Sequence, residues 1–594
     1  MTDNAIRRRD FLTRAGIAGA TAATGGAATA ANALPQVADL VLRNGKILTV
    51  DAEFTIARAV ATAGDRIIAV GSDAAMKSHT GPATRILDLK GKTVIPGLVD
   101  GHAHMDREGL KAIFPSLGPV RSIRDIQSRI AELARKCKPG EWIVTMPIGD
   151  PPFYFDVPGI LAEKRWPTRQ ELDEAAPDNP VLIRCIWGFW RSTPPLVSCA
   201  NTAALNRAGI TRNTASPDPM LQIVTDQNGD PTGVFLESEM QPLAELIWFR
   251  EATRFSRADR ARALSISAQA YHAYGTTSVF EEHGVANEVL RAYQDALRGG
   301  KLTMRATLVF SPNWKAAGAA PLGSFVEAWA GWLGEPGLGN DWLKVTGLHA
   351  NIQHRPADDL RAAAAPYTGW SGFNYDTGLP PERLKELALH CAHNDIRLIA
   401  NAGTSPGIID LLEQIDQEVP LQGRRWVVGH VGRLSPRDIE RIVRMGLVIT
   451  PHTNASIFKA GHSSLPPEQQ EELTPLRRLL DAGVKVALVT DNVPVSMFWP
   501  IWESVARLSV NNERVAPNQA ITRAEAIRCS TIHGAYLSFD EAKKGSIEPG
   551  KLADLAVLSA DPLTVEEQNI REIRSLMTIV GGRSVYQSPD WTPG

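Results

Sequence analysis

Short apolar segments, separated by turn-forming residues, occupy both ends of the chain. At the amino end, residues 39–43 and 46–50 flank Asn44-Gly45, a dipeptide that favours a tight hairpin between two strands. The strand-like segments near the carboxyl end are residues 554–558, 577–580 and 583–586. Two strand-rich ends around a different middle predict a composite β-sandwich domain, formed by residues 36–95 together with residues 545–594.

The middle of the chain alternates between strand-like and helix-like patterns. Residues 381–394 carry apolar side chains at helical spacing, and Ser435-Pro436 and Thr522-Arg-Ala-Glu525 are typical first residues of helices. The strand-like segments between such helices are residues 277–280, 396–400, 426–428, 447–450 and 485–490. Repeated units of strand and helix indicate an α/β fold, specifically a (β/α)8 barrel of the TIM type over residues 96–544.

This alternation stops between about residue 140 and residue 257, where prolines are frequent. Aromatic residues gather there, in residues 153–155 and 187–190. We interpret the segment as a subdomain inserted into the barrel and covering its mouth. Its aromatic side chains, Trp187 among them, are expected either in its own core or in a wall that contacts substrate.

The composition is that of a globular protein with a large core. The chain has 594 residues, of which 44% are hydrophobic and 22% charged, and its net charge of −2 offers no basic surface for nucleic acid. Its five cysteines lack the spacing of a disulfide framework, so we expect free thiols, with a Cys185–Cys199 bridge as the open alternative.

Residues 1–33 have the pattern of an export signal rather than of a folded segment. Arg7-Arg8-Arg9-Asp10-Phe11-Leu12 precedes an Ala/Gly-rich run, and Ala31-Asn32-Ala33 offers a cleavage site. These features resemble a twin-arginine signal peptide, which implies recognition by the twin-arginine export machinery and a periplasmic or secreted location. The alternative is an ordinary charged tail. No later segment approaches the roughly 20 apolar residues of a membrane span.

Polar residues that can bind metal follow several of the predicted strands. His102 and His104 come after the apolar residues 93–95, and side chains two apart in an extended chain point to the same side. Two imidazoles aimed at one point are suitable ligands for a metal ion. The polar residues at the ends of later strands are Asn401, His430, His452 and Asp491. Because barrel enzymes carry their chemistry at the carboxyl ends of strands, these residues predict one shared site.

Three segments together resemble the amidohydrolase superfamily. They are residues 96–104 (Pro-Gly-Leu-Val-Asp-Gly-His-Ala-His), Thr490-Asp491, and residues 545–558 (Gly-Ser-Ile-Glu-Pro-Gly-Lys-Leu-Ala-Asp-Leu-Ala-Val-Leu). Within it, the chain is most similar to the amidohydrolase-3 group, which includes N-substituted formamide deformylases. The resemblance implies a (β/α)8 barrel with a composite sandwich, one or two divalent metal ions, often zinc, and hydrolysis of a carbon–nitrogen bond.

The resemblance also implies roles for single residues. The implied metal ligands are His102, His104, Lys344 as a carboxylated bridging lysine, His430 and Asp491, with Asp491 and His430 also catalytic. Relatives carry a histidine where this chain has Asn401, a poorer zinc ligand because its oxygen is neutral, and a glutamate where it has Gly429. A single ion held by His102, His104 and Asp491 is therefore more plausible here than in relatives, and a second ion is doubtful. His283, His349 and His452 stay open as replacements for the missing histidine. His452, Asn401 and Trp187 are candidate substrate contacts.

The expected activity is that of a metal-dependent hydrolase of carbon–nitrogen bonds other than peptide bonds. Its substrate would be a small amide, N-formyl or N-acyl compound, attacked by metal-activated water. Two alternatives stay open: hydrolysis of an ester, lactone or cyclic imide, and a degenerate homologue that binds a ligand without turnover. The sequence leaves the assembly open, with a homodimer as one form.

Overall fold

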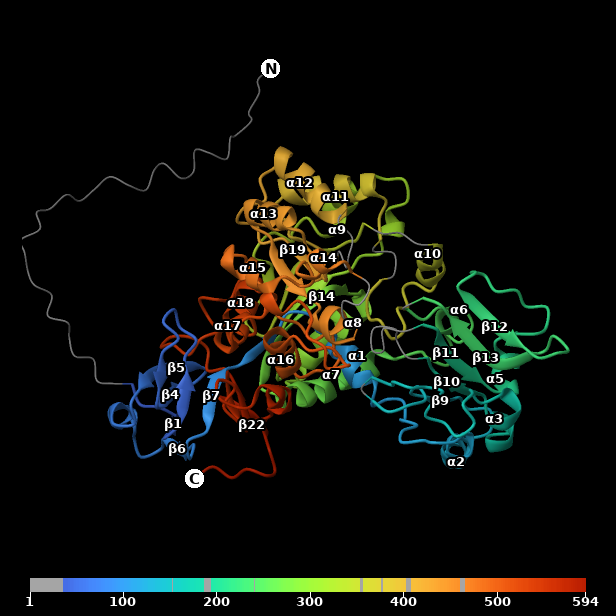
Figure 1. Ribbon diagram of the computed structural model, residues 1–594, viewed down its shortest axis with the longest axis horizontal. Coiled ribbons are helices and arrows are strands. Elements are labelled where there is room, and N and C mark those ends of the chain that lie inside the picture. Colours follow the sequence, from blue (N-terminus) through green and yellow to red (C-terminus); the bar gives the residue numbers. More distant parts are fainter. Residues whose placement is uncertain are drawn as a thin grey trace, which may run out of the picture. The chain divides into compact units, whose positions relative to one another are not determined.

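The computed structural model describes residues 36–594 (Figure 1), except for residues 152, 186–193, 240, 353–355, 375–377, 402–406 and 460–464. The predicted signal peptide and Trp187 therefore lie outside the described residues. Among the described residues, no helix is long and apolar enough to cross a bilayer. All five cysteines are free thiols, so the alternative Cys185–Cys199 bridge is not formed.

A parallel sheet with the strand order β20-β19-β18-β17-β15-β14-β8 forms the centre of the fold. Its strands are β8 (Leu98–Asp100), β14 (Thr276–Val285), β15 (Arg305–Phe310), β17 (Leu343–His349), β18 (Leu398–Asn401), β19 (Val427–Val431) and β20 (Val448–Pro451). The strand bodies are largely buried, as parallel sheets with covered faces require. Because the strands are parallel, their carboxyl ends meet at one edge.

Residues 485–491 join the two outer strands of this sheet. On one side, the backbone N–H of Ile449 in β20 donates to Lys485 O over 3.1 Å. On the other side, Gly101 N donates to Leu488 O over 3.1 Å, and Asp491 N donates to His102 O over 2.9 Å. The last residues of this segment therefore lie beside the residues that follow β8.

Helices connect the parallel strands in sequence. They are α7 (Arg257–His272), α8 (Asn287–Arg298), α9 (Leu322–Trp329), α11 (Pro381–His393), α12 (Gly407–Glu418), α13 (Pro436–Met445), α15 (Leu476–Asp481) and α17 (Arg523–Cys529). Two of them begin as predicted, because Ser435 and Thr522 accept hydrogen bonds from the third residues of α13 and α17. The local signals for these helix starts are thus confirmed.

Strands from both ends of the chain share a second sheet, of order β23-β22-β21-β7-β2-β3. Its strands are β2 (Lys46–Leu48), β3 (Ile56–Ala57), β7 (Thr93–Pro96), β21 (Leu555–Leu558), β22 (Ser575–Val580) and β23 (Arg583–Gln587). It packs against a third sheet of order β5-β4-β1-β6, with side chains such as Leu42, Val60, Val94 and Leu555 in one buried cluster. The strands of the third sheet are β1 (Leu40–Arg43), β4 (Ala59–Ala63), β5 (Arg66–Gly71) and β6 (Arg85–Asp88).

The predicted hairpin at Asn44-Gly45 is wrong. The turn is present, with a left-handed φ of 54° at Asn44, but β1 and β2 on its two sides belong to different sheets. β1 pairs with β4 and β6, while β2 pairs with β3 and β7. The turn thus leads the chain from one sheet to the other, because the partners of β1 and β2 come from different, more distant segments.

A further sheet, of order β12-β13-β11-β10-β9, lies within the segment where the alternation of strand and helix stops. Its strands are β9 (Ile143–Thr145), β10 (Val181–Ile183), β11 (Leu196–Ala200), β12 (Leu221–Thr225) and β13 (Pro231–Glu237). Helices α2 (Ile123–Ala134) and α3 (Arg169–Ala175) share a buried cluster with these strands. The limits of this region as a subdomain stay a prediction.

A buried ion pair fastens the central sheet to the carboxyl-terminal strands. Arg305, the first residue of β15, donates to both carboxylate oxygens of Asp554 over 2.7 and 3.0 Å, and both side chains are about 3% exposed. Gly581 N donates to the same carboxylate over 2.8 Å. We expect Asp554→Ala to lower the free energy of unfolding by about 3 kcal/mol, because it leaves the Arg305 charge buried without its counter-ion.

The midpoint of denaturation by urea measures this change. Asp150→Ala is the matched control, since it removes the partner of Arg121 in an exposed ion pair and should leave the midpoint unchanged. Equal midpoints for Asp554→Ala and the wild type would contradict a structural role for the pair.

Candidate metal centre

Two segments far apart in the sequence interlock at the carboxyl edge of the parallel sheet. The buried carboxylate of Asp100, the last residue of β8, accepts hydrogen bonds from His102 N and Thr490 N, both over 3.0 Å. The Asn492 side chain bonds both backbone groups of His104, accepting from its N–H over 2.9 Å and donating to its carbonyl over 2.8 Å. Each segment thus fixes the backbone of the other.

The side chains of His102, His104 and Asp491 converge from these segments. His104 Nε2 lies 3.0 Å from His102 Nε2 and 3.0 Å from Asp491 Oδ1, and His102 Nε2 lies 3.6 Å from the same oxygen. All three side chains are buried. With metal–ligand bonds of about 2 Å, one divalent cation could contact all three atoms. The structure therefore brings together the three predicted residues on which a metal site most depends.

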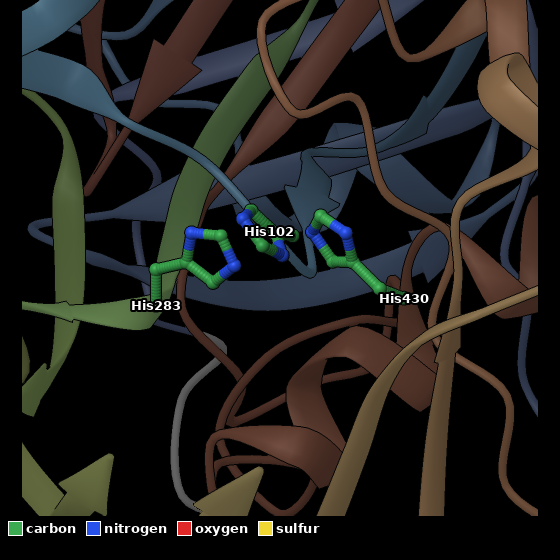
Figure 2. Close-up of side chains that lie close together, drawn as sticks. All are labelled: His102, His283 and His430. Atoms are coloured by element: carbon green, nitrogen blue, oxygen red, sulfur yellow. The ribbon is translucent and has the colours of Figure 1, made fainter. Parts of the chain in front are cut away.

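More histidines surround this group. His430 in β19 and His283 in β14 have rings whose centroids lie 4.6 and 4.8 Å from that of His102, and Figure 2 shows the three rings facing one another. His452, directly after β20, places Nε2 at 3.0 Å from Asp491 Oδ2. His349, the last residue of β17, has its ring centroid 5.5 Å from that of His283.

Burial keeps five of these imidazoles neutral, those of His102, His104, His283, His349 and His430. It lowers the pKa of His104 to about 4 and those of His349 and His430 to about 3, and it takes the pKa values of His102 and His283 well below their ordinary range. A neutral imidazole keeps a lone pair, which a metal ion requires. The histidines are therefore in the form that binds a cation.

Asp491 keeps its negative charge in these buried surroundings. Burial raises its pKa, but hydrogen bonds with His104 and His452 outweigh that effect and hold the pKa well below its ordinary range. The buried Arg107 contributes to the same end, with Nη2 2.9 Å from Asp491 Oδ1. The centre thus combines neutral nitrogen donors with one anionic oxygen donor.

Three residues in or beside the centre have a strained backbone conformation. Asp491, Asn492 and His430 have left-handed φ angles of 48°, 63° and 54°. Such conformations cost a residue other than glycine about 1 kcal/mol or more and concentrate at functional sites, where the surrounding structure enforces them. The hydrogen bonds between the two interlocked segments provide that enforcement at Asp491 and Asn492.

Glu282 is a member of the centre that sequence reasoning missed. Its Oε2 is hydrogen-bonded to His102 Nδ1, and its Oε1 accepts from Thr450 Oγ1 over 2.6 Å. With Nδ1 engaged, His102 is left with Nε2 for a cation, which is the usual arrangement of a metal-binding histidine and its supporting carboxylate. The sequence indicated a strand only to residue 280, whereas β14 continues to Val285.

Gly429 provides the room for this carboxylate. A Cβ built on Gly429 would lie 1.5 Å from Glu282 Oε1 and 2.5 Å from Asn401 Oδ1. Any side chain at this position would therefore displace Glu282 from His102. Relatives were expected to carry a glutamate at position 429. In this chain, the space at Gly429 is filled by a glutamate from a different strand, Glu282 in β14.

Lys344 is not at the centre, so its expected role as a carboxylated metal ligand is wrong for this structure. Its Nζ donates to the carbonyl of Ser538 and, over 2.9 Å, to Asp540 Oδ1. Lys344 is the second residue of β17, whose carboxyl end is His349. It therefore lies toward the amino edge of the sheet, away from the edge where the histidines gather.

Asn401 ends β18 at the carboxyl edge, as expected from the sequence. Its backbone N–H donates to Asn351 Oδ1 over 2.7 Å. Its side-chain amide has no hydrogen-bond partner among the described residues. A buried amide without protein partners is available for a ligand, so a substrate contact stays a prediction for Asn401 and His452, while Trp187 lies outside the described residues.

Comparisons with known proteins identify the family of this chain. The sequence model of the amidohydrolase family matches residues 85–586. The chain is 28% identical over 584 residues to the N-substituted formamide deformylase of Arthrobacter pascens, covering 93% of this chain and 99% of that protein. It is 25% identical over 570 residues to the protein LONG AFTER FAR-RED 3 of Arabidopsis thaliana, covering 93% of this chain and 92% of that protein.

A solved structure shows the same fold. The chain superimposes on an uncharacterized metal-dependent hydrolase from Pyrococcus horikoshii with a TM-score of 0.65 and 20% identity, covering 89% of this chain and 99% of the other. The expected enzyme class, a hydrolase of carbon–nitrogen bonds other than peptide bonds, agrees with the family and with the Arthrobacter relative. Since the family model matches well over half of its residues, this chain belongs to the amidohydrolase family and is a hydrolase.

Proposed function

We propose that this chain is a metal-dependent hydrolase that cleaves a carbon–nitrogen bond of the amide, N-formyl or N-acyl type in a small molecule. The observation that carries the proposal is the convergence of His102 Nε2, His104 Nε2 and Asp491 Oδ1 within 3.6 Å of one another. The bond type is supported by the similarity to a formamide deformylase over nearly the full length of both chains.

We propose that the central sheet is a closed (β/α)8 barrel with residues 485–490 as its eighth strand. The hydrogen bonds of this segment to β20 and to the residues after β8 support closure. The site would then occupy the carboxyl-terminal face of the barrel, where such enzymes carry their chemistry. The two sheets built from both chain ends would form the composite sandwich domain of residues 36–95 and 545–594.

The donors present fit a divalent cation, and we propose zinc. Imidazole nitrogen and carboxylate oxygen are zinc's ordinary ligands in hydrolases, and a three-residue set leaves a coordination position open. His102, His104 and Asp491 would hold this ion. A bound divalent cation supplies Lewis acidity, which polarises a carbonyl group and makes water a better nucleophile at neutral pH.

Asp491 is the residue placed to move the proton. Its ionised carboxylate accepts a proton from the water whose oxygen attacks the carbonyl carbon, and it returns that proton to the nitrogen when the carbon–nitrogen bond breaks. His452 holds Oδ2 of Asp491 over 3.0 Å and so fixes the orientation of the carboxylate. Arg107 favours the ionised form of Asp491 before the reaction begins.

Aromatic side chains gather close to this group of residues. The helical turn Asn454–Lys459 begins two residues after His452, and Phe458 in it contacts the rings of Phe153 and Trp499 at centroid distances of 5.7 and 5.2 Å. The ammonium group of Lys459 lies 5.3 Å from the centre of the Phe153 ring. We propose that this cluster contacts an apolar or aromatic part of the substrate.

We expect activity on N-formyl and N-acyl amines to disappear on treatment with a chelator and to return with zinc or manganese. His102→Ala should lower the zinc content, and both His102→Ala and Asp491→Asn should lower kcat/KM by at least about 100-fold. Metal analysis and a panel of such substrates measure these effects. The exposed His393→Ala serves as the control and should change neither quantity. Full turnover by the chelator-treated protein would contradict the proposal.

We expect Gly429→Ala to weaken metal binding about 10- to 100-fold, because the added Cβ forces Glu282 away from His102. Glu282→Gln should weaken binding to a similar degree. Competition with a chromogenic chelator measures the affinity. Gly334→Ala is the matched control, since its Cβ would meet no atom within 4 Å. Unchanged affinity in Gly429→Ala would show that Glu282 does not support His102.

We further propose that residues 1–33 direct export through the twin-arginine machinery, on the basis of Arg7-Arg8 and the cleavage site at residues 31–33. Replacing Arg7-Arg8 by Lys-Lys should retain the full-length chain in the cytoplasm of a bacterium with this pathway. Fractionation and amino-terminal sequencing measure the outcome, and Arg43→Lys, outside the signal, is the control. Periplasmic protein that still begins at residue 1 would contradict cleavage.

A further inference from the structure

A phenylalanine from the segment after β17 lies against the histidines of the centre. The ring of Phe373 meets that of His283 edge to face, with centroids 5.0 Å apart, and its centroid lies 6.1 Å from that of His104. The Phe373 residue is only 4% exposed. Aromatic rings at these separations are in van der Waals contact. Phe373 therefore forms a wall on the side of the centre to which His104 and His283 belong.

Hydrogen bonds hold the backbone on both sides of this wall. After it, Asn374 N donates to Ser311 Oγ over 3.1 Å, and the Asn374 side chain donates to the carbonyl of Ser311. Before it, Gly372 O accepts from Ala286 N over 2.8 Å. Ser311 and Ala286 directly follow β15 and β14. The wall is thus fastened to the ends of two strands of the central sheet.

Apolar side chains pack behind the Phe373 ring. It shares a buried cluster with Leu110, Trp370 and Val493, among others. In a close-packed cluster a ring cannot turn aside without opening a cavity or displacing its neighbours, and either change costs free energy. The position of the wall is therefore fixed before a substrate binds.

The wall leaves little room beside an ion held by His102, His104 and Asp491. An ion about 2 Å from His104 Nε2 lies about 3 Å from the centre of that ring, and hence at most about 9 Å from the centre of the Phe373 ring. The carbonyl carbon of a substrate whose oxygen contacts the ion lies about 3 Å from it. Since a carbon atom approaches a ring to about 4 Å, a chain that extends from the carbonyl toward Phe373 has space for about one more carbon.

The aromatic cluster of Phe153, Phe458 and Trp499 belongs to a different part of the same edge. Phe458 lies in the turn after β20, whereas Phe373 is fastened to β14 and β15. Strands β19, β18 and β17 separate β20 from β15 in the central sheet. A bound amide can therefore direct its acyl carbon toward Phe373 and the substituent on its nitrogen toward the Phe458 cluster.

We propose that Phe373 limits the length of the acyl group that the enzyme accepts. This inference rests on the proposed metal-dependent hydrolysis of amides and narrows its substrate class. The substrate is an amide of a short acid, with formyl preferred and acetyl the longest acyl group that fits, and it carries an apolar group on the nitrogen. Phe373 discriminates by contact alone, because a longer chain would overlap a ring that cannot move aside.

Competition between two substrates tests the proposal. The N-formyl and N-butyryl derivatives of 2-phenylethylamine are offered together to the zinc-loaded full-length chain, and the formate and butyrate released give the ratio of the two kcat/KM values. This ratio does not depend on the fraction of the protein that is folded or loaded with metal. We expect it to exceed about 100 for the wild type, and to fall by at least about 10-fold in Phe373→Ala.

Phe373→Leu keeps an apolar side chain for the buried cluster and should lower the ratio by about 3-fold or more. The matched control is Phe325→Ala, which removes a ring that packs against Trp314 and Trp329, and it should keep the wild-type ratio. A wild-type ratio near or below one, or an unchanged ratio in both Phe373 variants, overturns the acyl limit and leaves the proposed function standing. No hydrolysis of any N-formyl or N-acyl amine by the zinc-loaded wild type overturns the proposed function and the inference with it.

Discussion

The fastening of residues 100–104 to residues 490–492 is the constraint on which the site depends. A buried carboxylate at Asp100 and a buried amide at Asn492 each bond to the backbone of the opposite segment. Together these two side chains set the spacing of two imidazoles and a carboxylate. Buried polar groups of this kind are tolerated because every donor meets an acceptor, and the same condition leaves the segments little freedom to shift.

Burial determines the chemistry of the centre as much as distance does. Burial keeps His102 and His104 neutral, while Asp491 remains ionised because hydrogen bonds and the Arg107 guanidinium replace its lost hydration. The charge of Asp491 is thus already balanced by neighbouring groups. The donor atoms therefore need little rearrangement to bind a cation. Glu282 supports the centre from outside the donor set. Its carboxylate is hydrogen-bonded to Nδ1 of His102, the ring nitrogen that does not face the other donors.

Local signals predicted much of the fold, and pairing between distant segments explains what they missed. Ser435 and Thr522 cap helices as expected, and His102 and His104 share one side of an extended segment. Asn44-Gly45 turns as expected too, but no local pattern tells that its flanking strands join different sheets. Lys344 was assigned to the centre by the resemblance alone, which does not show that this residue lies near the start of β17 and not at its carboxyl end. The approach of Glu282 in β14 to Gly429 in β19 depends on the register of these strands and of the three between them, β15, β17 and β18, which local sequence patterns do not reveal.

The backbone from Thr93 to His104 passes without a connecting helix from one sheet into another. β7 pairs with β21, so that Pro96 lies opposite Leu555, and two residues later the same chain enters the parallel sheet as β8. The strand that leads to the first histidines thus has for its neighbour a segment that is synthesised long after it. β7 can complete its pairing only once residues 555–557 have been made.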